Sequence, residues 1–207
     1  MKKSLLTVCV ILGSFILSNT TEAQGLRARR GSWQVGNQEN TEYKRPNYPA
    51  QDIYEEAINY SSGSNGVKRD IYMAFEKYLQ AADMGNPLAQ TRVGACYYYG
   101  SGVEKNLKKA FFYWSKASEA DIAEAHYELG RMYYNGEECK RNYDTAIALF
   151  HKAENANIPR AFYMLGMCYL NGTGVKRDKE KAIEYLQKAA SQGVHDAKYE
   201  LDELLKK

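Results

Sequence analysis

The chain has 207 residues, 26% of them charged, and a formal net charge of +3. This length fits one ordinary domain. Because charges of both signs are interspersed along the sequence, no stretch provides the field of one sign that attracts nucleic acid or an anionic membrane surface. We therefore expect no nucleic-acid partner.

The first 23 residues have the pattern of a signal peptide. Lys2 and Lys3 precede an apolar run of 13 residues, Leu5 to Leu17, and small residues allow a cut after Ala23. As a helix the run would span about 20 Å, short of the roughly 30 Å hydrocarbon core, so a cleaved signal is favoured over an uncleaved anchor. Cleavage removes two lysines and one glutamate, which lowers the net charge from +3 to about +2. The mature chain is then expected to be periplasmic or secreted, without a membrane span.

Residues 24–49 form the next segment. They are rich in Gly, Asn, Gln and Arg, include two prolines and contain few aliphatic side chains. This composition is typical of a flexible linker or arm.

From residue 50 onward the sequence repeats itself with a period of 36 residues. A Leu-Gly pair at Leu129-Gly130 recurs at Leu165-Gly166, and as Val93-Gly94 one period earlier. The same step links glycines and several sets of alanines, namely Gly100, Gly136 and Gly172; Ala74, Ala110, Ala146 and Ala182; Ala81, Ala117, Ala153 and Ala189; and Ala89, Ala125, Ala161 and Ala197. Such a repeat predicts a stack of identical supersecondary units.

Each unit is predicted to contain two helices. Ala125, Leu129 and Tyr133 lie at four-residue spacing on one helical face, and Gly136 follows, where a C-terminal cap favours glycine. The tyrosines Tyr97, Tyr133 and Tyr169 are expected in the core. A second helix is expected to begin after an Asp or Asn that caps its N-terminus, and this column contains Asp70, Asn106, Asn142 and Asp178.

The pattern as a whole is similar to the Sel-one-like repeat family. The most complete copy of the pattern begins at Ala161 and ends at Lys188-Ala189-Ala190. It includes Leu165-Gly166, Tyr169 and Gly172-Thr-Gly174-Val175. Residues 88–195 contain three such repeats, residues 50–87 a divergent one, and residues 196–207 a C-terminal capping helix. The resemblance implies an all-α fold, a right-handed α-solenoid of antiparallel helix pairs. It also implies a non-enzymatic role as an adaptor or regulator that binds other proteins.

No constellation of residues predicts catalysis, a metal site or a cofactor. The histidines His126, His151 and His195 show no metal-ligand spacing, and the sequence lacks the common hydrolase and phosphate-binding motifs. His126 falls in a column of helix-packing residues, which favours a structural role.

The mature chain contains three cysteines, Cys96, Cys139 and Cys168, and an odd number excludes a fully paired disulfide framework. A bridge between Cys139 and Cys168 and buried thiols are the two interpretations. The cysteine-rich branch of the family, described as binding β-lactams, pairs cysteines between neighbouring repeats. Here Ser118 and His126 occupy such positions, so that activity is not expected.

The partner-binding surface is predicted on the concave face, which the first helices of the repeats would line. Tyrosine and arginine are enriched at binding hot spots. Tyr98, Tyr134 and Arg131 are expected to be exposed there, whereas the Tyr127 and Tyr163 column also fits packing. The predicted binding residues are Tyr98, Tyr127, Arg131, Tyr134, Asn135, Arg160, Tyr163, Met167 and Asn171.

These residues lead to one functional prediction and one alternative. The prediction is a monomer in the bacterial envelope that binds a peptide or protein surface. The alternative is a carbohydrate-binding or hydrolytic envelope protein that uses the aromatic surface.

Export can be tested on the protein isolated from the cell envelope. Its intact mass should correspond to a chain that begins at Gln24 or within a few residues of it. Full-length protein in the cytosol would contradict both the signal peptide and the localisation.

Overall fold

The structure is a computed structural model that describes residues 47–206. The signal peptide predicted at 1–23 and the arm predicted at 24–49, apart from its last three residues, lie outside this range. Within residues 47–206 the chain forms nine helices and no strand. They are α1 (Gln51–Ser62), α2 (Ile71–Asp83), α3 (Pro87–Tyr99), α4 (Leu107–Glu119), α5 (Ala123–Asn135), α6 (Tyr143–Asn155), α7 (Pro159–Asn171), α8 (Lys179–Ser191) and α9 (His195–Leu205).

The predicted N-caps are confirmed in all four even-numbered helices. In α4, α6 and α8 the cap side chain accepts a hydrogen bond from the backbone N–H three residues on, and the Asp70 carboxylate accepts two at the start of α2. Each bond satisfies an N–H group that has no partner within its helix. The cap column therefore fixes where the second helix of every pair begins.

A glycine ends each of α3, α5 and α7. Gly100, Gly136 and Gly172 have φ between 71° and 74°, and their N–H groups bond the carbonyl four residues back. A residue without a Cβ atom adopts this left-handed conformation at the least cost. Two residues further on, Gly102 and Gly174 share the conformation, and Glu138 adopts it in the middle repeat with φ 56°.

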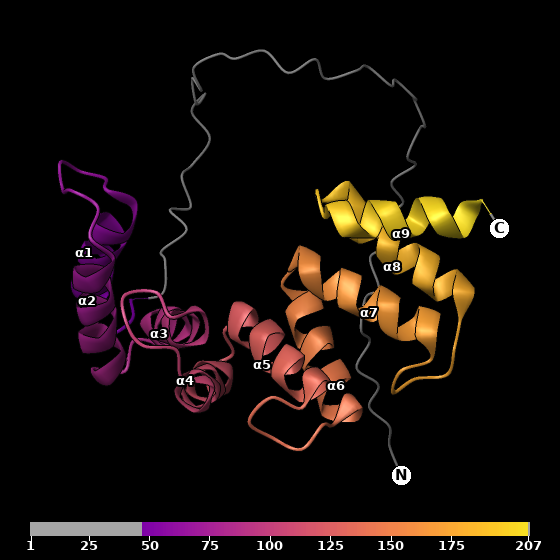
Figure 1. The fold of residues 1–207 in the computed structure, drawn as a ribbon, viewed down its shortest axis with the longest axis horizontal. Coiled ribbons are helices and arrows are strands. Elements are labelled where there is room, and N and C mark those ends of the chain that lie inside the picture. Colours follow the sequence, from indigo (N-terminus) through magenta and orange to yellow (C-terminus); the bar gives the residue numbers. More distant parts are fainter. Residues whose placement is uncertain (1–46, 207) are drawn as a thin grey trace, which may run out of the picture. The chain divides into compact units, whose positions relative to one another are not determined.

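The helices pack mainly against their neighbours in sequence. The strongest contacts join α1 with α2, α3 with α4, α5 with α6 and α7 with α8, and weaker contacts join each pair to the next. Figure 1 shows the pairs following one another in chain order from α1 to α9. The fold class is thus an α-solenoid of helix pairs, as the repeat predicts.

Small residues let the two helices of a pair approach closely. All the alanines of the repeat columns are buried, and all but Ala74 have no exposed surface. Gly94 faces Trp114 of the partner helix, where an added Cβ atom would lie 2.5 Å from the indole ring. Equivalent contacts join Gly130 to Phe150 and Gly166 to Leu186.

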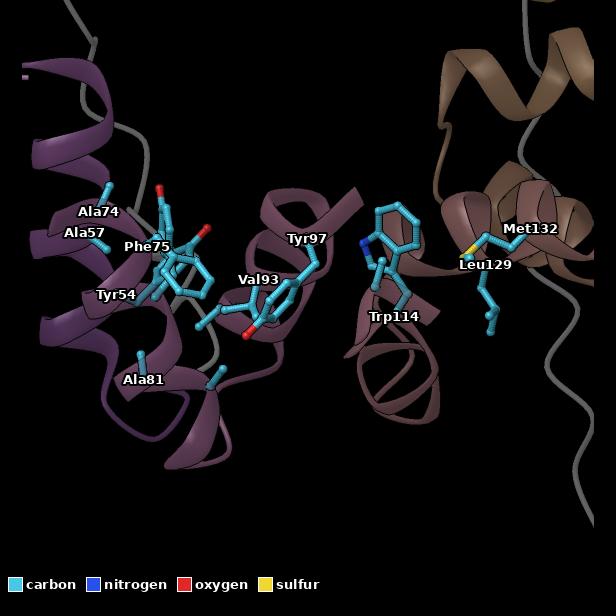
Figure 2. Packing of buried hydrophobic residues seen from close by; sticks show 14 of the residues in the cluster. Tyr54, Ala57, Ala74, Phe75, Ala81, Val93, Tyr97, Trp114, Leu129 and Met132 are labelled. Atoms are coloured by element: carbon cyan, nitrogen blue, oxygen red, sulfur yellow. The ribbon is translucent and has the colours of Figure 1, made fainter. Parts of the chain in front are cut away.

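Trp114 is the largest fully buried side chain of this core. Figure 2 shows it in the middle of the cluster, with Tyr97 on one side and Met132 on the other. Its Nε1–H donates to the carbonyl of Thr91 at 3.1 Å, which satisfies the ring nitrogen and fixes the ring's orientation.

The core assignment of the tyrosine column needs a correction. Tyr97 is buried, but Tyr133 and Tyr169 are only half-buried at the edge of the core. The deep positions belong to the preceding column, where Met132 and Cys168 lie. Tyr169 instead stacks on Tyr185 with ring centroids 5.6 Å apart.

The close approach at Gly94 predicts the effect of adding one methyl group. Alanine in an unobstructed helix stabilises by up to about 1 kcal/mol relative to glycine. At position 94 the methyl would overlap the buried indole, so we expect Gly94→Ala to lower the free energy of unfolding by about 1–3 kcal/mol. Urea unfolding followed by circular dichroism measures this change. A gain in stability would show that Trp114 does not limit the approach of α3 to α4.

Candidate functional site

The odd-numbered helices α3, α5 and α7 carry a stripe of side chains outside the packing columns. In α5 the stripe is Glu124, Glu128, Arg131 and Asn135, whose spacing of four, three and four residues keeps them on one face. The equivalent stripe of α3, one period earlier, ends with Tyr99. The equivalent stripe of α7, one period later, begins with Arg160. We call the surface formed by these stripes the odd-helix face.

A pocket of about 360 Å³ opens on this face between α3, α5 and α7. We call it the charged pocket. Arg92 and Tyr99 line it from α3, Glu124, Tyr127 and Glu128 from α5, and Arg160 from α7, together with Thr91, Ala95, Trp114, Ile158 and Pro159. Three successive repeats therefore contribute to one site.

A short ion pair joins Glu128, which lines the charged pocket, to Arg131 on the same helix, which lies outside the lining. The Glu128 side chain is 15% exposed and that of Arg131 is 23% exposed, and Nη1 of Arg131 lies 2.6 Å from Oε2 of Glu128. Burial raises the pKa of the Glu128 carboxyl, although the guanidinium groups of Arg131 and Arg160 oppose this. Burial tends to lower the pKa of Arg131, but Glu128 and the neighbouring tyrosines together outweigh this effect and raise the pKa.

Two longer ion pairs involve the arginines that line the charged pocket. Nη1 of Arg160 lies 4.0 Å from Oε1 of Glu128, and Nη2 of Arg92 lies 3.9 Å from Oε2 of Glu124. Both arginines are exposed. The pairs exceed the 2.7–2.9 Å of a charge-assisted hydrogen bond, so both guanidinium groups keep donors for other partners.

Aromatic rings hold Arg131 in place. Its guanidinium lies over the rings of Tyr98 and Tyr127, 5.4 and 5.9 Å from their centroids. Nη2 also donates to Oη of Tyr98 at 3.2 Å. Tyr98 in turn packs against Trp114, with ring centroids 5.3 Å apart. The network thus links the charged pocket to the core.

A second pocket of about 480 Å³ adjoins the first. We call it the apolar pocket. It shares Arg92, Ala95 and Tyr99 with the charged pocket, and its other lining residues are Ile58, Ser61, Tyr78, Cys96 and Ser101. Tyr99, which is 61% exposed, therefore lines both pockets.

The structure brings four of the nine predicted binding residues together around the charged pocket, namely Tyr98, Tyr127, Arg131 and Arg160. The expected exposure of Tyr98 and Arg131 needs a correction, because both are half-buried. The Tyr98 ring packs on Trp114, and Arg131 pairs with Glu128. Tyr127 is buried, so its packing interpretation is confirmed.

The other five predicted residues lie outside the charged pocket. Tyr134 is half-buried against Tyr143 and Phe150, contrary to the expected exposure. Asn135 is exposed and donates to Glu137 at 2.8 Å. Tyr163 and Met167 pack on the C-terminal core cluster, and Asn171 lines a separate pocket beside α9.

Sequence reasoning missed Arg92, Tyr99, Glu124 and Glu128. The signal for them was present in the spacing around Arg131, because Glu124 and Glu128 lie seven and three residues before it on one helical face. Arg92 lies one period before Glu128, and Tyr99 one period before Asn135.

His126 forms a hydrogen-bonded link between two helix pairs. Its ring is buried, with Nδ1 2.8 Å from Oγ of Ser118 and Nε2 2.8 Å from Oδ1 of Asp121. The bond from His126 lowers the pKa of the Asp121 carboxyl. Ser118 lies in the last turn of α4 and His126 lies in α5, so the contact joins consecutive repeats at the two positions for which the resemblance implied a cysteine pair. Burial of the imidazole is consistent with a structural role.

The cysteines of the described residues are free thiols, so Cys139 and Cys168 are not bridged. Sγ of Cys139 instead lies 3.7 Å from the carbonyl oxygen of Met132, to which it donates. Burial raises the pKa of Cys168 and Cys96 to about 11 in each case. The interpretation as buried thiols therefore holds for Cys168, whereas Cys96 and Cys139 are unpaired but only half-buried.

Comparison with known proteins identifies the family. The Sel1 repeat model matches residues 55–86, 87–122, 123–157 and 159–194, which together are more than half of the chain. The chain therefore belongs to the Sel1 repeat family, whose members generally mediate protein–protein interactions and are generally not catalysts. No curated protein matches it significantly.

Solved structures show the same fold. A Sel1 repeat protein from Oxalobacter formigenes is 30% identical with a TM-score of 0.67, and the match covers 73% of this chain and 62% of that one. A protective antigen of uropathogenic Escherichia coli with an SLR fold is 26% identical with a TM-score of 0.67, over 75% of this chain and 33% of that one. Immunity protein Pa5087 from Pseudomonas aeruginosa is 28% identical with a TM-score of 0.52, over 73% and 56%. This chain thus spans less than two thirds of each of these proteins.

Adjacent tyrosines are predicted to differ sharply in their effect on stability. Tyr98→Ala removes a half-buried ring from Trp114 and Arg131, so we expect the free energy of unfolding to fall by about 2 kcal/mol. Tyr99→Ala, the matched control, removes an exposed ring and should cost less than about 1 kcal/mol. Chemical unfolding of both variants measures the difference. Equal losses would contradict the supporting role of Tyr98.

Proposed function

We propose that the chain is a protein-binding module of the bacterial cell envelope and that it holds a segment of its partner against the odd-helix face. One observation carries this proposal: Arg92, Tyr99 and Arg160 are exposed around a largely buried Glu128–Arg131 ion pair. Tyrosine and arginine contribute strongly to binding when they surround a well-packed centre.

The construction of the charged pocket favours binding energetically. Arg131 is fixed by Glu128 and by the rings of Tyr98 and Tyr127, so this side chain has little entropy left to lose when a partner arrives. Interfaces gain affinity when such ordering is complete before association.

The carbohydrate-binding alternative has less support. Stacking on a sugar requires the open face of an aromatic ring. Of the three tyrosines that line the two pockets, Tyr78 and Tyr127 are buried, so Tyr99 is the one tyrosine of these pockets that offers an exposed ring.

The proposed location in the envelope rests on the signal-peptide pattern of residues 1–23. Over residues 47–206 the chain has no helix of sufficient length and apolarity to cross a membrane.

Site-specific photocrosslinking tests which face binds. The photoreactive residue p-benzoylphenylalanine replaces Tyr99 on the odd-helix face in one variant. In the matched control it replaces Phe112 of α4, which is also an exposed aromatic residue. Irradiation in cells that naturally express the protein should yield a crosslinked partner from position 99 and little from position 112.

The reverse pattern would contradict the proposal and place the partner on the even-numbered helices. Crosslinks to glycan alone at position 99 would favour the carbohydrate-binding alternative.

A further inference from the structure

The two adjoining pockets point to the chemistry of the partner. We infer that the odd-helix face takes an extended peptide whose acidic side chain enters the charged pocket and whose neighbouring apolar side chain enters the apolar pocket. This inference rests on the proposed function and specifies which segments the site accepts.

The balance of charge at the charged pocket favours a carboxylate. Arg92, Arg160, Glu124 and Glu128 are the charged residues that line the pocket, and Arg131 pairs with Glu128 from outside the lining. With Glu128 neutralised in this way, the two lining arginines face one remaining carboxylate, that of Glu124. A partner that supplies one carboxylate would complete the set of charges.

The excess charge is available at the rim of the pocket. Arg131 is engaged with Glu128 at 2.6 Å, whereas Arg160 and Arg92 have only long pairs of 4.0 and 3.9 Å. Their side chains are 65% and 49% exposed, so each can turn donors toward a ligand without breaking a short bond. A guanidinium offers five N–H donors in a planar fork that matches a carboxylate.

A lysine or arginine of a partner would fit less well. Glu128 already accepts from Arg131, and a second cation near it would also meet the exposed charge of Arg160. A cation near Glu124 would likewise meet the exposed charge of Arg92. Like charges brought together in this way oppose binding.

The apolar pocket supplies the other half of the recognition. Ile58 of α1 and the half-buried Ala95 and Cys96 of α3 line it, and Ile58 is partly exposed to solvent. An aliphatic or aromatic side chain would bury this surface. Because Tyr99 and Arg92 line both pockets, one short extended segment can reach them together, with its two side chains on either side of Tyr99.

Selection from random peptides of about 12 residues tests this inference without assuming a partner. The full chain serves as bait in one selection, and the Arg92→Gln/Arg160→Gln variant serves as bait in a second. The matched control is Arg69→Gln/Arg177→Gln, which loses the same charge at two exposed arginines outside both pockets. The unchanged chain and the control should enrich peptides that pair Asp or Glu with an aliphatic or aromatic residue.

The affinity of one enriched peptide then resolves the contacts. We expect fluorescence anisotropy to show a loss of at least about tenfold when its acidic residue becomes the amide, and a similar loss with the Arg92→Gln/Arg160→Gln variant. The control variant should change affinity by no more than about twofold. Ile58→Ser should weaken binding and remove the preference for an apolar residue. Arg160→Gln alone, at the more exposed position, repeats the test if the double variant is unstable.

The outcomes separate this inference from the proposed function. Peptides that crosslink at position 99 but tolerate the amide, or that carry Lys or Arg in place of the acid, would overturn the inference and leave the odd-helix face as the binding surface. If no peptide is enriched, or if enriched peptides crosslink only at position 112, both are overturned.

Discussion

The contact on which the rest of the structure depends is the approach of a helical glycine to a large side chain of the next helix. Gly94 lies against Trp114, Gly130 against Phe150 and Gly166 against Leu186, and in each pair an added Cβ atom would come within 3 Å of the partner. Buried alanines extend the same close approach along both helices. With so little free space the rotation of each odd-numbered helix is fixed, because turning it would drive a side chain into its partner.

A fixed rotation places the same stripe of every odd-numbered helix on one face. On α5 this stripe presents Glu128 and Arg131 side by side, while Arg92 and Arg160 approach from the neighbouring repeats. Packing and exposure differ between adjacent residues here: Tyr98 packs on Trp114 and supports Arg131, whereas the next ring, Tyr99, remains exposed. Packing in the core therefore orders the side chains of the charged pocket in the absence of a partner.

The sequence predicted what depends on local spacing. The period, the Asp and Asn caps, the C-terminal glycines and the buried alanines all follow from contacts within one repeat or between adjacent repeats. It could not predict which of two adjacent columns faces outward, because one residue turns a helix by about 100° and the rotation is set by tertiary packing. Tyr98 and Tyr134 were assigned to the surface for this reason. The roles of Glu128 and of the Ser118–His126 bond depend on partners in other helices, so neither follows from residue types alone.

The central claim is that rigid helix pairs hold Arg92 and Arg160 ready for an acidic segment on the odd-helix face. Nuclear magnetic resonance of the arginine side-chain N–H groups tests it most directly, because all arginines of the described residues are followed in one spectrum while an acidic peptide selected by the chain is added. The account predicts that the Nε signals of Arg92 and Arg160 shift on titration, and that those of Arg69 and Arg177 do not. Shifts confined to Arg69 and Arg177, with Arg92 and Arg160 unchanged, would contradict it.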